Sequence, residues 1–199
     1  MAAPRAVIFG CAGPTLSDDE KAFLRDSDPW GFILFARNVS TPEGTAALVA
    51  SLRETVGRQA PVFIDEEGGR VSRLQPPHWR RWADAGEAVA RLDDRQAETV
   101  MRLRYRLIAA DLAALGIDCN CVPVVDVRFA QTHAVIGMRA YGTSAARVSL
   151  LARAAWDGLA AGGVVAGLVG VDEADFEWAI GGFGGIGVRQ AELREDAEL

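Results

Sequence analysis

The chain has 199 residues, of which 50% are hydrophobic and 24% charged, with a net charge of −6 and a pI near 5.0. This composition is typical of a globular domain with a core of its own and not of a disordered segment. The acidic balance argues against nucleic acid and anionic membranes as main partners, because both recruit basic surfaces. No apolar run approaches the roughly 20 residues that a membrane-spanning helix needs.

The first apolar run, 6–11, is too short for the core of a signal peptide and predicts a strand. Of the three cysteines, Cys119 and Cys121 lie two residues apart in a strand-like run, so they share a face and are badly placed to bond to each other. We therefore expect reduced thiols and a cytoplasmic protein. With two histidines in the chain, a zinc site has few ligands to draw on, and neither a metal nor another cofactor is predicted.

Strand and helix patterns alternate in chain order. Ser17 with Glu20 has the spacing of a capping box, and Gly57 and Gly116 are typical helix ends. With no hairpin signals between the strands, the pattern predicts a parallel α/β sheet with covering helices, either doubly wound or part of a (β/α) barrel. The predicted strands are 6–11, 31–36, 61–65, 117–127 and 164–170, and the predicted helices are 16–29, 40–57, 95–116 and 144–163.

The composition changes from residue 171 onward. The last part contains "GGFGG", no clear strand and an acidic end, with at most one short helix at 188–199. We therefore expect a folded part over 1–170 and a divergent, Gly-rich acidic tail over 171–199.

The stretch "VFIDEEGG" (62–69) ends an apolar run on three carboxylates. Both candidate folds place their sites at the carboxyl ends of strands. In an extended chain Asp65 and Glu67 point to one face and Glu66 to the other. The two glycines that follow permit positive φ and the close approach of a ligand to the backbone.

Arg70 and Arg73 follow within a few positions. Either they hold a polar ligand through bidentate hydrogen bonds, or they pair with the neighbouring carboxylates at an ordinary surface strand end. A similar alternative applies to Arg139 in "IGMRAYG" (136–142), which is either aimed at the same pocket or solvated at a helix entry. In "LQPPHWRRW" (74–82), His78 and Trp79 would suit a sugar-stacking surface, but we favour a role in pinning the loop.

Four stretches occur in the order and spacing of the glycoside hydrolase family 3 catalytic domain. The chain resembles this family over residues 5–165, most of all its bacterial cytoplasmic β-N-acetylglucosaminidases of peptidoglycan recycling. The resemblance implies a partial (β/α) TIM-type barrel over 1–170, with about five parallel strands and covering helices. The matching stretches are "GFILFARN" (31–38), "FIDEEGGRVSRL" (63–74), "GIDCNCVPVVDV" (116–127) and "IGMRAYG" (136–142).

The resemblance implies three substrate-binding residues. Asp65 matches the Asp of the family's Asp-x-Glu-Gly-Gly-Arg stretch, with Glu66 in the variable place, and Arg73 matches another residue of the sugar pocket. Arg139 matches the Arg of an Asn-Arg-Ser-Phe-Gly loop, with Met138 replacing the usual Asn. Asp126 ends a Pro-x-x-Asp strand, where the resemblance implies a structural role. Further candidates for the pocket lining are Glu67, Arg70, His78 and Trp79.

The chain departs from the family where the chemistry lies. Relatives carry Lys-His-Phe-Pro-Gly-His-Gly on the strand after the next helix, with the later His as acid/base. By register these positions are 169–175 here, and none of those chemical groups is present. The family nucleophile, an Asp in a Thr-Asp-Asp-Leu-type strand end, falls beyond residue 199. A retaining glycosidase needs both an acid/base and a nucleophile. Because neither is present, we predict no catalytic residue and impaired or lost hydrolysis.

Three interpretations follow. The first is a β-N-acetylhexosaminidase relative that keeps a wall for N-acetylglucosamine-containing sugars. The second is a non-catalytic half-barrel that pairs with itself or another protein, because open strand edges and an exposed apolar face invite association. The third is the remnant of a longer gene whose frame changed near residue 165.

Overall fold

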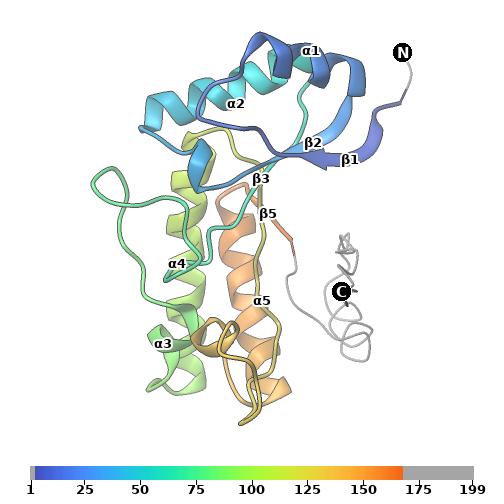
Figure 1. The fold of residues 1–199 in the computed structure, drawn as a ribbon. Coiled ribbons are helices and arrows are strands. Elements are labelled where there is room, and N and C mark those ends of the chain that lie inside the picture. The colour runs from blue at the N-terminus through green and yellow to red at the C-terminus, as the bar shows by residue number, and fades with distance from the viewer. Residues whose placement is uncertain (1–2, 168–199) are drawn as a thin grey trace.

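The computed structural model describes residues 3–167 (Figure 1). The predicted tail, 171–199, and its boundary lie outside the described residues. The strands are β1 (Arg5–Phe9), β2 (Pro29–Leu34), β3 (Val62–Ile64), β4 (Cys119–Asn120) and β5 (Val165–Ala166). The helices are α1 (Asp18–Ser27), α2 (Pro42–Val56), α3 (Ala85–Val89), α4 (Asp94–Ala114) and α5 (Ala145–Ala161), with 3-10 turns η1 (Ala36–Asn38) and η2 (Gly137–Arg139).

The five strands form one parallel sheet in the order β1-β2-β3-β4-β5. Each connection therefore moves the chain one strand along in the same direction, whereas a doubly wound sheet reverses its order. Sequential order with helical connections is the arrangement of a (β/α) barrel. The structure confirms the predicted fold class, an α/β fold with five parallel strands and covering helices.

Local signals in the sequence place most helix ends correctly. The Ser17 side chain accepts a hydrogen bond from the backbone N–H of Glu20, and the Glu20 carboxylate accepts one from the backbone of Ser17, which completes the capping box. The helix α2 begins after Thr41 and ends at Gly57, whose φ of 66° is left-handed. These contacts lie within one or two turns, so the sequence pattern is sufficient to find them.

The predicted strand 117–127 is wrong in length. The strand β4 covers Cys119–Asn120, the N–H of Cys121 adds one bond to the Ile64 carbonyl, and Val124 forms an isolated bridge. Pro123 has no N–H to continue the ladder, and the N–H of Val124 is directed to the Tyr141 hydroxyl instead. The short elements α3, η1 and η2 were not predicted, because none is long enough to show a hydrophobic period.

The core lies between the sheet and the helices, and α4 and α5 run side by side in close contact (Figure 1). Gly158 of α5 makes this approach. A Cβ atom there would lie 2.4 Å from the carbonyl oxygen of Arg102 on α4, so only glycine fits. The α4 side chains Met101, Tyr105 and Ile108 are fully buried below this contact.

We expect Gly158→Ala to destabilise the chain by about 1–3 kcal/mol, because the added methyl group forces the two helices apart. Urea unfolding followed by circular dichroism measures the change. Gly13→Ala is the control, since a Cβ at Gly13 meets no atom within 4 Å. Equal unfolding midpoints for the two variants would show that α4 and α5 are not in this close contact.

Candidate functional site

The candidate site lies at the carboxyl ends of β3 and β4. Asp65 follows the last residue of β3, and Cys121 follows the last residue of the neighbouring strand β4. The charge of Asp65 is the largest influence after burial on the pKa of the Cys121 thiol, which is raised, and Glu67 acts in the same direction. The charges of both carboxylates also act on the Arg139 guanidinium, in keeping with the shared side that their alternation predicts.

Asp65 forms an ion pair with Arg73, with Oδ2 and NH2 2.8 Å apart. Both side chains are about three-quarters buried, so solvent screens the pair less than it would a surface pair. The Nε of Arg73 is buried and has no hydrogen-bond partner among the described residues. The structure thus brings together two of the predicted substrate-binding residues.

Glu67 and Arg139 form a bidentate pair across 72 positions of sequence. The guanidinium Nε lies 2.8 Å from Oε2 and its NH2 lies 2.7 Å from Oε1. Glu67 is 5% exposed and Arg139 15% exposed, so the alternative of a solvated arginine is wrong. The hydrogen bonds to Glu67 raise the pKa of Arg139, and the charges of Asp126 and Asp65 add to this effect.

Glu66 points the other way and anchors the segment. Glu66 is 1% exposed. One carboxylate oxygen accepts hydrogen bonds from the backbone N–H groups of Arg73 at 2.7 Å and Leu74 at 2.9 Å, and the other is bonded to the Ser72 hydroxyl. Its own backbone exchanges two hydrogen bonds with the buried Asn120 side chain.

Burial raises the pKa of Glu66, although these hydrogen bonds oppose the shift. Sequence reasoning assigned Glu66 no role. The one signal for it in the sequence was its place between Asp65 and Glu67, where an extended chain turns a charged side chain away from theirs.

Gly68 and Gly69 have positive φ, 89° and 61°, as predicted. The groups that approach them closely are protein side chains. A Cβ at Gly68 would lie 2.0 Å from NH2 of Arg104, and one at Gly69 would lie 2.0 Å from Oδ1 of Asp84. The glycine pair therefore serves the packing of the segment against its own fold.

The helix α4 supports the site from below through residues that sequence reasoning missed. Arg104 is buried and donates hydrogen bonds to the carbonyls of Glu67 at 2.9 Å and Ala83 at 2.6 Å. The Tyr105 hydroxyl lies 3.4 Å from the same Glu67 carbonyl and 3.0 Å from the Tyr141 hydroxyl. An arginine on the buried face of a periodic helix was the signal that could have indicated this network.

The other predicted lining residues do not join these pairs, although Arg70 and Arg139 donate to the same carbonyl, that of Val135. Arg70 is exposed and donates to the carbonyls of 134–136. His78 is exposed and its ring contacts Trp79, which packs on the core. Trp82 lies between the guanidinium groups of Arg80 and Arg104, about 5 Å from each. Trp79 and Trp82 therefore pack this segment against the core, and a sugar-stacking role of His78 stays a prediction.

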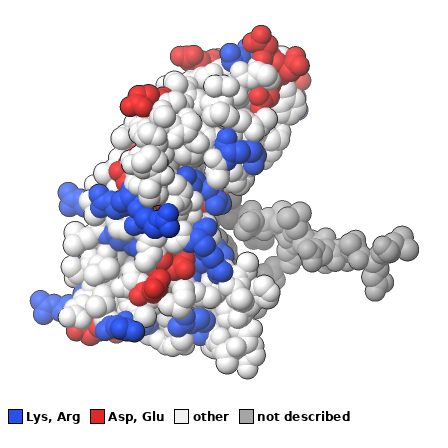
Figure 2. Space-filling model, turned by 60° about the vertical axis from the view of Figure 1, so that its left-hand side comes forward, with Lys and Arg blue, Asp and Glu red and all other residues white. Residues whose placement is uncertain are grey.

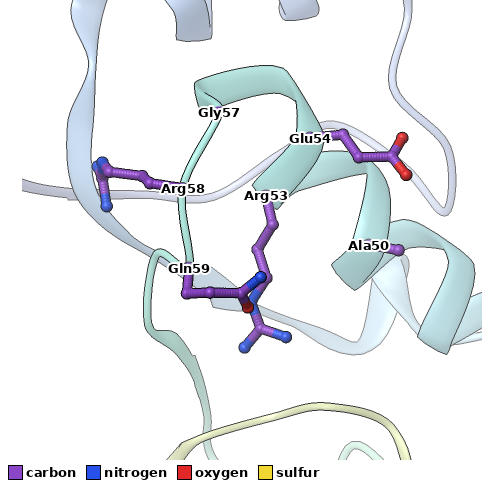
Figure 3. A pocket seen from close by; sticks show the side chains of 6 residues that line it. All are labelled: Ala50, Arg53, Glu54, Gly57, Arg58 and Gln59. Atoms are coloured by element: carbon purple, nitrogen blue, oxygen red, sulfur yellow. The ribbon is translucent and has the colours of Figure 1, made fainter.

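A separate surface hollow of about 570 Å³ lies where α2 ends, at the opposite end of the strands. In Figure 3 the side chains of Arg53 and Gln59 lie close together, whereas those of Glu54 and Arg58 point away. Both arginines are already paired, Arg53 with Asp118 and Arg58 with Asp28. This hollow therefore shows structural ion pairs and no converging binding groups.

Within residues 3–167, no group of three or more His, Cys, Asp or Glu side chains is placed to hold a metal ion. The thiols of Cys119 and Cys121 are both free, and burial raises the pKa of Cys119 to about 12. They are therefore protonated at neutral pH and poor nucleophiles. None of the helices in this part of the chain is long and apolar enough to cross a membrane.

The geometry is that of a hydrogen-bonding wall. Two arginine–carboxylate pairs lie side by side at the strand ends, fixed from below by Glu66 and Arg104. Residues 5–168 match the model of the glycosyl hydrolase family 3 N terminal domain. This chain belongs to glycosyl hydrolase family 3.

Several proteins of known name resemble this family 3 chain. A beta-hexosaminidase of Bordetella pertussis is 34% identical over 180 residues, covering 85% of this chain and 51% of that protein. One of Methylococcus capsulatus is 36% identical over 165 residues, covering 80% and 46%. The structure of NagZ from Neisseria gonorrhoeae in complex with N-trifluoroacetyl-D-glucosamine gives a TM-score of 0.76 at 32% identity, covering 83% and 50%.

This family 3 chain therefore spans about half the length of the relatives that it matches. The positions 169–175, where the resemblance places the acid/base motif, lie outside the described residues. The substrate-binding roles of Asp65, Arg73 and Arg139 stay predictions.

Glu66→Gln should keep every hydrogen bond of the carboxylate, because one amide oxygen can accept from both N–H groups and the amide can donate to Ser72. The pKa of Glu66 is raised in the folded state, so the contribution of this group to stability is largest below its ordinary pKa of about 4.5 and is lost as pH rises through the folded value. We therefore expect Glu66→Gln to gain stability relative to wild type between pH 4 and pH 7, measured by urea unfolding.

Glu66→Leu should instead cost about 2–5 kcal/mol at all these pH values, because it leaves the N–H groups of Arg73 and Leu74 without acceptors. Glu54→Gln removes the same charge from the exposed face of α2 and serves as the control. Equal stability of Glu66→Gln and wild type over the whole pH range would contradict a buried carboxylate.

Proposed function

We propose that this chain forms one wall of a β-hexosaminidase-like binding site for N-acetylglucosamine-containing sugars, in which hydrolysis is impaired or lost. The observation that carries the proposal is the pairing of Asp65 with Arg73 and of Glu67 with Arg139 at the carboxyl ends of β3 and β4. This is where (β/α) barrels bind their ligands. The likeness to a NagZ structure that holds N-trifluoroacetyl-D-glucosamine supports the choice of sugar.

The chemistry of the wall suits sugar hydroxyls. A carboxylate that is already bonded to one guanidinium keeps further lone pairs to accept hydroxyl groups, and the guanidinium keeps donors for hydroxyl oxygens. Glu66 fixes the backbone of Arg73, so the donor and the acceptor of this pair are positioned before a ligand arrives.

Hydrolysis needs more than this wall supplies. A retaining glycosidase uses an acid and a nucleophile about 5 Å apart. Asp65 and Glu67 are each already engaged in an ion pair with an arginine. The residues 169–175 offer no histidine in the place where the resemblance sets one. Binding without efficient turnover, in cytoplasmic peptidoglycan recycling, is therefore the activity that we propose.

A second candidate is a non-catalytic half-barrel that associates through its sheet edges. The described sheet is open, with β1 at one edge and β5 at the other. Val165 on β5 is 61% exposed, which is unusual for a β-branched residue in a strand. An open edge with an exposed apolar side chain invites pairing with a second copy or another protein.

Sugar binding is tested by NMR titration of the chain with N-acetylglucosamine. We expect shifts in the amides of 65–74 and 137–141, and at least tenfold weaker binding in Asp65→Ala and Arg139→Ala, since each loses a direct hydrogen-bonding group. Asp157→Ala, which breaks a surface ion pair on α5, is the matched control. No shifts, or equal affinity in all variants, would refute the sugar-binding wall.

Turnover is tested with a chromogenic N-acetylglucosaminide at high protein concentration. We expect the wild-type chain to show no turnover above the turnover of the Asp65→Ala variant. Hydrolysis that disappears in this variant would show that the chain is an active enzyme.

Association through the edge is tested by light scattering. We expect dimers or larger species that dissociate in Val165→Lys, because a charge on an edge strand opposes pairing. Phe129→Lys, at an exposed apolar loop residue, is the control. A monomer at high concentration in wild type would eliminate self-association through this edge.

A further inference from the structure

Arg70 links the two segments that carry the sugar-binding wall. It belongs to the segment 65–74, and its NH2 group donates hydrogen bonds to three successive carbonyls in the loop that follows β4. The acceptors are the oxygens of Ala134 at 2.7 Å, of Val135, and of Ile136 at 3.1 Å. Carbonyls that converge in this way need a donor, and arginine side chains supply one at the ends of helices in the same manner.

Two of these carbonyls also hold Arg139. The backbone N–H of Arg139 lies 2.9 Å from the Ile136 oxygen, and its guanidinium NH1 lies 3.4 Å from the Val135 oxygen. Arg70 and Arg139 therefore share two acceptors, one for the backbone of Arg139 and one for its side chain. If these carbonyls move, both parts of Arg139 lose their positions relative to Glu67.

The stretch 129–137 depends on Arg70 for its place. Within residues 3–167, Arg70 is the one residue outside 128–142 that forms a hydrogen bond with this stretch. The side chains of Phe129 and Val135 are 65% and 57% exposed, so packing contributes little here. A segment with few buried apolar contacts opens locally at low cost, and the few bonds that hold it carry its order.

The turn η2, which carries Arg139, is held by packing at one end only. That end is seated on α3, where a Cβ at Gly86 would lie 2.2 Å from the carbonyl oxygen of Ala140. The other end begins at Gly137, whose φ of 45° is left-handed, and a Cβ there would lie 3.4 Å from NH2 of Arg70. Arg70 therefore acts at the end of the turn that the packing on α3 does not fix.

Arg70 differs from the other arginines of the wall in its partners. Figure 2 shows basic side chains beside acidic ones over the lower half of the molecule, and both Arg73 and Arg139 are paired with carboxylates. Arg70 is exposed and forms no ion pair with another residue of 3–167. Its bonds go to uncharged carbonyls of the neighbouring loop, so its guanidinium orders backbone and leaves no carboxylate compensated.

We propose that Arg70 is a positioning residue of the sugar-binding wall, which holds the carbonyls of 134–136 so that Arg139 meets Glu67 before a ligand arrives. Arg70 then raises the affinity for sugar without contacting the sugar, because a pair that is already formed does not have to be ordered on binding. The effect on affinity rests on the proposed function, whereas the effect on Arg139 does not.

The position of Arg139 is measured without sugar, by NMR of the full chain with labelled arginine nitrogen atoms. Its Nε–H group is bonded to the buried Glu67 carboxylate, so the hydrogen should exchange slowly with water, and the signal is identified by its loss in Arg139→Lys. We expect Arg70→Gln to speed this exchange about fivefold or more, because the loop loses a charged donor. Arg70→Lys keeps the charge without the planar fork and should give an intermediate rate.

Arg58→Gln is the matched control. Arg58 also donates to two successive carbonyls, those of Pro29 and Trp30, but it lies at the opposite end of the strands. Its substitution should change neither the exchange at Arg139 nor the affinity for sugar. Urea unfolding of each variant separates a local effect from a global one. Because Arg70 is exposed, we expect Arg70→Lys to unfold at the wild-type midpoint.

The affinity for N-acetylglucosamine is then measured by titration of the same variants. We expect binding about fivefold weaker or more in Arg70→Gln, and the order of affinities to follow the order of exchange rates at Arg139. Weaker binding with unchanged exchange at Arg139 would overturn the proposal, since Arg70 would then contact the sugar itself. Unchanged exchange together with unchanged affinity would overturn it as well.

The same measurements separate this proposal from the proposed function. If the wild-type chain binds no sugar, the proposed function fails, whereas faster exchange in Arg70→Gln still shows that Arg70 positions Arg139. If the wild-type chain binds sugar and Arg70→Gln leaves the exchange unchanged, the sugar-binding wall stands and the role of Arg70 is refuted.

Discussion

The buried carboxylate of Glu66 is the contact on which the candidate site depends. The residues 65–74 leave the sheet at Ile64 and have little ladder of their own. By binding the N–H groups of Arg73 and Leu74, Glu66 turns the chain back so that the guanidinium of Arg73 reaches Asp65. Asn120 fixes the Glu66 backbone to β4. A group that faces away from the ligand side thus sets the geometry of the groups that face it.

The consequence for function is charge compensation. Each carboxylate on the ligand side is matched by one arginine, and each pair lies largely out of solvent. Such a wall can accept and donate hydrogen bonds at fixed positions, and burial raises the pKa of the two neighbouring thiols, Cys119 and Cys121, so that they stay protonated. The wall is therefore suited to recognition of a polyhydroxylated ligand.

The sequence predicts what depends on short range. Helix caps such as Ser17 with Glu20 involve residues within one turn, and sequential strands with regular helices indicate a (β/α) arrangement. The pairing of Glu67 with Arg139 joins residues 72 positions apart, and the support from Arg104 depends on how α4 is rotated against the sheet. The first has no local signal, and the second has only a buried arginine on a periodic helix. The overlong strand 117–127 has another cause, because an apolar run marks burial and Pro123 interrupts the pairing within it.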